Sequence, residues 1–88
     1  MKFNKIEDVK NFVTIIKEKF ASNIEMYNRL AWFENVNYTT TSEYYGELLI
    51  LLDEIVELKE INELKGDVIE LIKVLQKIFN WVIIRYGI

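Results

Sequence analysis

Residues 43–67 read EYYGELLILLDEIVELKEINELKGD, and this stretch decides the fold class. Its apolar residues recur every three or four positions, which is the period of a helix that buries one face. The residues on that face are Tyr45, Leu48, Leu51, Leu52, Ile55, Leu58 and Ile61. We therefore predict one helix over residues 43–65, with Thr40 and Glu43 as the capping pair at its start.

Gly66 directly follows this helix, at the position where glycine often ends a helix by adopting left-handed backbone angles. Asp67 and Glu70 have the spacing of another capping pair, so a last helix is expected from there to about residue 86. A joint this short predicts that the two helices form an antiparallel hairpin.

Two further helices are predicted in the N-terminal part of the chain, over residues 5–21 and 23–34. The capping pairs expected at their starts are Asn4 with Glu7 and Ser22 with Glu25. The apolar period continues across the break, from Phe20 to Ile24, and we expect both side chains to be buried. A single helix over residues 5–34 is therefore the alternative.

The segment between the second and third helices is rich in asparagine and threonine. Residues 35–42 read NVNYTTTS, and such short polar side chains favour turns and extended backbone. Elsewhere few residues break helices, because the 88 residues include three glycines and no proline. We expect residues 1–88 to form one all-α domain, an antiparallel three- or four-helix bundle.

The chain contains no histidine and no cysteine. It therefore has no Ser-His or Cys-His nucleophile, no thiolate metal site and no disulfide. Its sequence also lacks a glycine-rich phosphate loop and the alternating acids of a calcium-binding loop. Asp53, Glu54 and Glu57 lie close together on one helix, and we interpret them as a solvated face. We expect no enzyme, no catalytic residues, no cofactor and no metal.

The longest uninterrupted apolar run, residues 48–52, is far shorter than the ~18 residues that indicate a membrane span. The first residues of the chain carry acids where a secretory peptide would be apolar. The absence of cysteine also fits a reducing compartment. We therefore expect a soluble, cytoplasmic protein without a membrane span.

Charge is unevenly distributed along the chain, although the net charge is only −3. Residues 34–70 hold ten acids and two lysines, a balance of −8, so the remaining residues carry +5. The bases are scattered, and direct nucleic-acid binding is not expected because it needs clustered bases. The acidic block, residues 34–70, predicts a surface that attracts a basic protein. The alternative is that its acids pair with the chain's own lysines and arginines.

Tyrosines and acids in and before the helix at 43–65 are the predicted partner-binding residues. They are Tyr38, Glu43, Tyr44, Glu47, Glu54 and Glu57. Tyrosine is favoured in binding surfaces because it offers a large contact area and a hydroxyl at little cost in entropy. The alternative for the tyrosines is packing on the core and the loop.

The last helix carries a second apolar row beside its main stripe. This row consists of Val74, Trp81, Ile84 and Ile88. A helix that is apolar on two sides is either central in its bundle or part of an oligomer interface. Central burial is the favoured interpretation, and a homodimer that associates through this row is the alternative.

Residues 43–47, Glu-Tyr-Tyr-Gly-Glu, followed by Leu49 and Leu52, resemble the segment that enters the inhibitory helix of the barstar family of ribonuclease inhibitors. The resemblance implies that Tyr44 is an inhibitory aromatic residue and that Glu54 takes the place of a key acid. It also implies a parallel sheet, for which the sequence shows no strand pattern.

Two binding positions of that family fall on apolar residues here, Leu48 and Ile50. At the level of size, acidity and helical pattern, the chain is similar to small helical immunity proteins that neutralise bacteriocins or toxins, and to phage-encoded inhibitors. Our leading hypothesis is an inhibitor that blocks a basic partner, such as a nuclease or another toxin, with the helix at 43–65 and the preceding loop. The alternative is a structural or regulatory homo-oligomer.

Overall fold

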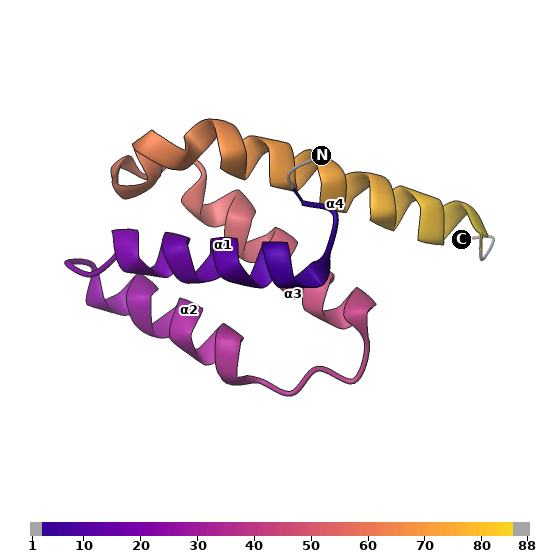
Figure 1. Ribbon diagram of the computed structural model, residues 1–88, viewed down its shortest axis with the longest axis horizontal. Helices are drawn as coiled ribbons and strands as arrows, with labels where there is room; N and C mark the ends of the chain where they lie inside the picture. Colours follow the sequence, from indigo (N-terminus) through magenta and orange to yellow (C-terminus); the bar gives the residue numbers. More distant parts are fainter. Residues whose placement is uncertain (1–2, 86–88) are drawn as a thin grey trace.

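Figure 1 shows the computed structural model of the chain, which describes the backbone of residues 3–85 and the side chains of residues 3–78. The described residues contain no strand, so the predicted all-α fold is confirmed and the sheet implied by the barstar resemblance is absent from them. The elements are α1 (Ile6–Lys19), α2 (Ile24–Asn35), α3 (Thr41–Ile55), the 3-10 helix η1 (Lys59–Leu64) and α4 (Lys65–Arg85).

Helices α1 and α2 lie side by side and antiparallel, joined by a tight turn (Figure 1). The two-helix prediction is therefore right and the single helix over residues 5–34 is wrong. A new helix starts after Asn23, because the side-chain oxygen of Asn23 accepts a hydrogen bond from the Met26 backbone N–H at 3.3 Å and so caps α2. At the start of α1, the Lys5 N–H donates to the Asp8 carboxylate at 3.2 Å. Both caps lie one residue later than the sequence predicted.

The helix predicted over residues 43–65 is wrong in its second half. Helix α3 starts with the expected cap, in which the Glu43 N–H donates to Thr40 Oγ1 at 3.1 Å, but it ends at Ile55. At 3.6 residues per turn, Ile55 and Ile61 would point roughly 120° apart on one straight helix. Both are fully buried, because the chain turns between them and continues as η1.

Gly66 also differs from its predicted role. It lies inside the first turn of α4, which begins at Lys65 directly after η1, so it ends no helix. Asp67, expected to cap a new helix start, lies within that first turn and not before it. The hairpin between α3 and α4 is made by the turn at 56–58 together with η1, and the two helices contact each other.

Apolar side chains from all five elements form the core. Those fully buried are Val13, Ile16, Phe20, Leu30, Phe33, Leu48, Leu52, Ile55, Ile61, Val68, Leu71 and Leu75. Two expectations about the apolar faces are wrong: Ile24 is 67% exposed, and Tyr44 is buried where Tyr45 was expected. Ile24 is exposed because it is the first residue of α2, beyond the turn that places Phe20 in the core.

Element η1 holds the two helical hairpins together. Its Glu63 pairs with Lys19 at 3.2 Å, and its Glu60 accepts a hydrogen bond from the Asn23 side chain at 3.2 Å. These contacts attach η1 to the end of α1 and to the turn between α1 and α2. Ile61 of the same element is fully buried. Among residues 3–85, no helix has the length and apolar content needed to cross a membrane.

Candidate protein-binding groove

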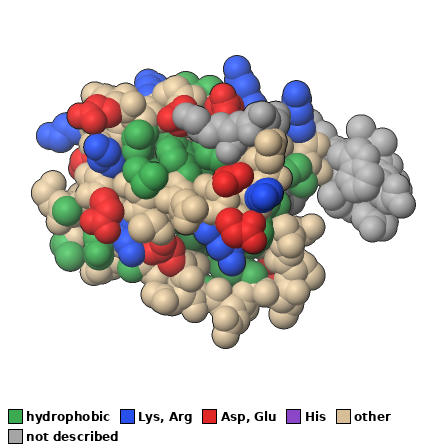
Figure 2. Space-filling model, in the orientation of Figure 1, with side chains coloured by type: hydrophobic (Ala, Val, Ile, Leu, Met, Phe, Trp, Pro, Cys, Tyr) green, Lys and Arg blue, Asp and Glu red, His purple; other side chains and the backbone are tan. Residues whose placement is uncertain are grey.

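Several acids of the acidic block are paired within the molecule. Glu34 pairs with Lys17 at 2.6 Å, and Glu57 pairs with Lys65 at 3.2 Å. Arg29 of α2 forms an ion pair with Glu54 of α3. On the face shown in Figure 2, acidic and basic side chains are interspersed and do not gather in one acidic patch. The alternative of internal pairing therefore holds for part of the block.

Glu34 is held by hydrogen bonds from two side chains of α1. It accepts hydrogen bonds from Lys17 and from Thr14 Oγ1, both at 2.6 Å. Burial raises the pKa of its carboxyl, but these two hydrogen bonds outweigh burial, so the pKa of Glu34 lies below its ordinary value of 4.5. The same contact raises the pKa of Lys17 above 10.5. This pair links α1 to the end of α2 and is structural.

Three acids of the block make no ion pair or hydrogen bond with any residue that the structure describes: Glu47, Asp53 and Glu70. Glu47 differs from the other two because it lies in a groove. The carboxylate of Glu43, one turn earlier, accepts hydrogen bonds from the hydroxyls of Thr39 and Thr40, the latter at 3.5 Å. Of the two carboxylates that line the groove, Glu43 accepts hydrogen bonds from the loop, whereas Glu47 accepts none from the described residues.

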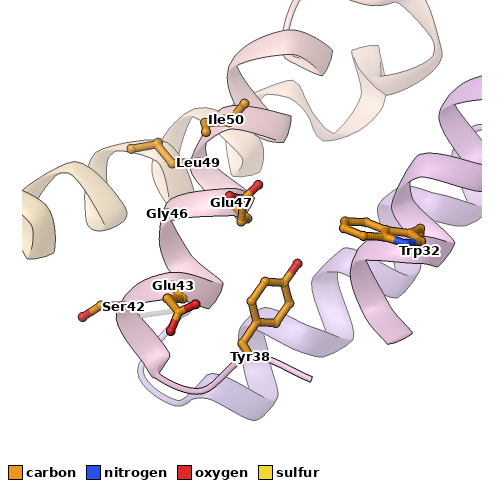
Figure 3. Close-up of a pocket in the computed structure, with 8 residues that line it drawn as sticks. All are labelled: Trp32, Tyr38, Ser42, Glu43, Gly46, Glu47, Leu49 and Ile50. Carbon is orange, nitrogen blue, oxygen red and sulfur yellow. The ribbon is translucent and has the colours of Figure 1, made fainter. Parts of the chain in front are cut away.

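The groove lies between α2, α3 and the loop that joins them (Figure 3). Its larger part is a cavity of about 650 Å³ lined by Trp32, Tyr38, Ser42, Glu43, Gly46, Glu47, Leu49 and Ile50. A second cavity of about 310 Å³ shares Trp32, Glu47 and Ile50 with the first and extends towards Arg29. Cavities of roughly 300–1,000 Å³ hold drug-sized ligands, so this groove can take a few side chains of a partner.

Helical spacing places these residues on one face of each helix. Glu43, Glu47, Ile50 and Glu54 follow one another along α3 at steps of four, three and four residues. On α2 the facing side chain is Trp32, which is 67% exposed, and Ile50 opposite is 56% exposed. Two large apolar side chains therefore remain in water beside the free carboxylate of Glu47. Trp32 and Ile50 line the same two cavities as Glu47, so exposed apolar surface and a free carboxylate share one site.

Tyr38 comes from the loop, and its hydroxyl points towards the space between Glu47 and Trp32 (Figure 3). This hydroxyl is buried and has no hydrogen-bond partner among the residues that the structure describes. Burial, and secondarily the charge of Glu47, raises the pKa of Tyr38 above 10. The Tyr38 ring is held by contacts with Phe33 and Tyr44, at centroid distances of 5.5 and 5.6 Å. It forms a fixed wall of the groove.

The predicted binding residues are thus divided among different places. Tyr38, Glu43 and Glu47 meet in the groove. Tyr44 is only 7% exposed, and burial raises its pKa to about 12, so its ring belongs to the core and not to the surface. Glu54 and Glu57 are the acids occupied by ion pairs with Arg29 and Lys65.

The predicted oligomer row lies largely outside the described part of the chain. Val74 is half-buried on α4. The side chains of Trp81 and Ile84, and residue Ile88 altogether, are outside the described residues.

Sequence reasoning missed the apolar half of the groove, namely Trp32, Leu49 and Ile50. The available signal was that Trp32 and Ile50 lie off the apolar stripes of their helices, yet are too large and apolar to be ordinary solvent-facing residues. No group of three or more metal-ligating side chains comes together among the described residues. Comparison of the chain with protein-family models, curated proteins and solved structures found no match.

Proposed function

We propose that this protein binds a basic protein partner through the α2–α3 groove and inhibits it by covering the partner's cationic surface. The observation that carries the proposal is that exposed Trp32 and Ile50 line the same cavities as the unpaired Glu47. Bound partners are anchored mainly by a few large side chains, and charge around them sets orientation and association rate.

The charge balance supports a basic partner. Residues 34–70 carry −8, which exceeds the +5 of the other residues, so internal pairing leaves a negative surplus. Glu47, in the groove, and Asp53, further along α3, contribute to that surplus. A negative surface draws a positive partner from solution, and the effect weakens as salt rises.

Inhibition is the interpretation that fits a chain whose sequence offers no His or Cys chemistry of its own. A small rigid domain can block a nuclease or another basic toxin by occupying the cationic surface that its substrate needs. The small helical immunity proteins that this chain resembles in size and acidity neutralise bacteriocins or toxins.

The test is affinity capture from the native host, with three immobilised versions of the protein. Glu47→Lys and Trp32→Ala are expected to lose the captured basic protein, while Asp53→Lys, which changes charge on α3 outside the groove lining, retains most of it. Helical circular dichroism must be unchanged in all three. Equal capture by all versions would show that the groove is not the binding site.

The second candidate is a homo-oligomer that associates through α4. It is favoured by the length of α4, whose C-terminal turns extend past the other helices in Figure 1. Sedimentation separates the two functions, because a tight homodimer that Trp81→Glu dissociates would support the oligomer, and a stable monomer would remove it.

A further inference from the structure

The α2–α3 groove also indicates which side chain of a partner it receives, and this inference rests on the function proposed above. We infer that the groove takes an arginine of the partner, with the guanidinium on Glu47 and an adjacent aliphatic side chain between Trp32 and Ile50. The groove offers one carboxylate without a donor and two apolar surfaces that remain in water.

A cation suits Glu47 best inside the groove, because it both donates hydrogen bonds to the carboxylate and compensates its charge. The neighbouring acids on the same face of α3 are already occupied, Glu43 by threonine hydroxyls and Glu54 by Arg29. An uncharged apolar segment would cover Glu47 without pairing it, and removing water from an unpaired carboxylate is costly. An acidic segment would add repulsion to that cost.

Arginine fits this site better than lysine. Its guanidinium is flat, is weakly hydrated for a cation, and donates several hydrogen bonds in a fixed fork that matches a carboxylate. It also stacks on aromatic rings, with tryptophan the strongest partner. Trp32 supplies such a ring across the groove from Glu47 (Figure 3). Lysine, a compact and strongly hydrated charge, gains less from these surroundings.

The molecule already contains this arrangement once. Arg29 of α2 bridges to Glu54 of α3, and both side chains remain close to half exposed. Glu47 lies seven residues before Glu54, about two helical turns along the same face. No arginine or lysine of the described chain reaches Glu47, so an arginine from a partner would repeat the Arg29–Glu54 pair two turns earlier.

The experiment uses three synthetic peptides that differ at one position. Each has the core Leu-X-Leu in a flexible glycine–serine context, with X as arginine, lysine or citrulline, which has the shape of arginine without its charge. Binding to the intact protein is followed by nuclear magnetic resonance at the indole N–H of Trp32, assigned with Trp32→Phe. We expect arginine to bind about tenfold or more tightly than citrulline, since charge-assisted bonds contribute roughly 1.5–3 kcal/mol, with lysine between them.

Two variants complete the cycle. Glu47→Gln should bind the arginine and citrulline peptides equally, while Asp53→Asn, which removes a charge from the same helix outside the groove lining, should keep the full preference. Equal binding of arginine and citrulline, a preference that survives in Glu47→Gln, or no peptide-induced shift at Trp32 would each overturn the inference. If capture of the native partner is lost with Trp32→Ala but not with Glu47→Gln, the arginine inference fails and the proposed function stands.

Discussion

Removing the hydroxyl of Tyr38 should make the protein more stable. The Tyr38 hydroxyl is buried without a hydrogen-bond partner in the described part of the chain, although water satisfies it in the unfolded chain. Tyr38→Phe deletes that one atom and keeps the ring contacts with Phe33 and Tyr44. Most substitutions of a well-packed residue destabilise a protein, so a gain would identify the lost hydroxyl as the cause.

The size of the effect follows from the environment of the side chain. A buried polar group without a partner costs roughly 1–3 kcal/mol, and the lower end applies because the Tyr38 side chain is only half-buried. We expect Tyr38→Phe to raise the free energy of unfolding by about 1 kcal/mol, which for a domain of this size raises Tm by about 4–8 °C.

Thermal and urea unfolding, followed by far-ultraviolet circular dichroism, measure this change directly. Tyr45→Phe is the matched control, because Tyr45 is half-buried and its hydroxyl is not among the buried unpaired groups. It should leave Tm nearly unchanged. A Tm that stays constant or falls in Tyr38→Phe would refute the reasoning, since it would mean that the hydroxyl has a stabilising partner in solution.

Three further predictions concern the core and the titrating groups. Ile61→Ala should lower the free energy of unfolding by about 2–5 kcal/mol, because Ile61 of η1 is fully buried. The exposed control, Ile24→Ala, should change it by no more than about 0.5 kcal/mol, and urea unfolding of the two variants measures the difference. Because the pKa of Glu34 is lower in the folded chain than its ordinary 4.5, its ionisation stabilises the fold above pH 4.5. That contribution is lost as pH falls through the lowered pKa, and Glu34→Gln should flatten the acid limb of a stability–pH curve. Burial raises the pKa of Tyr44 to about 12, so stability should decline from pH 10 towards 12 as the unfolded chain ionises first, and Tyr44→Phe should reduce that decline in alkaline unfolding.

The acids of the acidic block fall into paired and unpaired groups that the sequence does not separate. Glu34, Glu54, Glu57 and Glu63 are paired with lysines or arginine of the same molecule. The three exposed pairs, made by Glu54, Glu57 and Glu63, contribute about 0–1 kcal/mol each, so they join elements without dominating stability. Glu47 makes no ion pair or hydrogen bond with the described residues, and the proposed function assigns it to a partner. Charge reversal at Glu54 would disturb both the Arg29 pair and the groove's end, which makes Glu47 the cleaner position for testing function.

The sequence alone determined the fold class and the chemistry that is missing. The three-to-four-residue period of apolar side chains is a local property, and it predicted a helix in the region of each α-helix, although it continued the third helix through the turn at 56–58 and η1. The loop at 35–42 and the Thr40 cap were likewise predicted, because short polar side chains act on backbone groups only a few residues away. The absence of histidine and cysteine is read directly from composition.

The tertiary structure alone decided where the long third helix breaks and which surface stays open. The apolar residues over 43–65 recur every three or four positions and so predict one continuous helix, yet Ile55 and Ile61 are both buried because the chain turns between them. The pairing of charges also depends on residues far apart in the sequence. Glu54 pairs with Arg29, 25 positions earlier, whereas Glu47 on the same helix face has no cationic partner among the described residues. Helical periodicity says which residues share a face of one helix, but which faces meet depends on how all the helices pack, and that packing leaves Trp32, Ile50 and Glu47 in the groove.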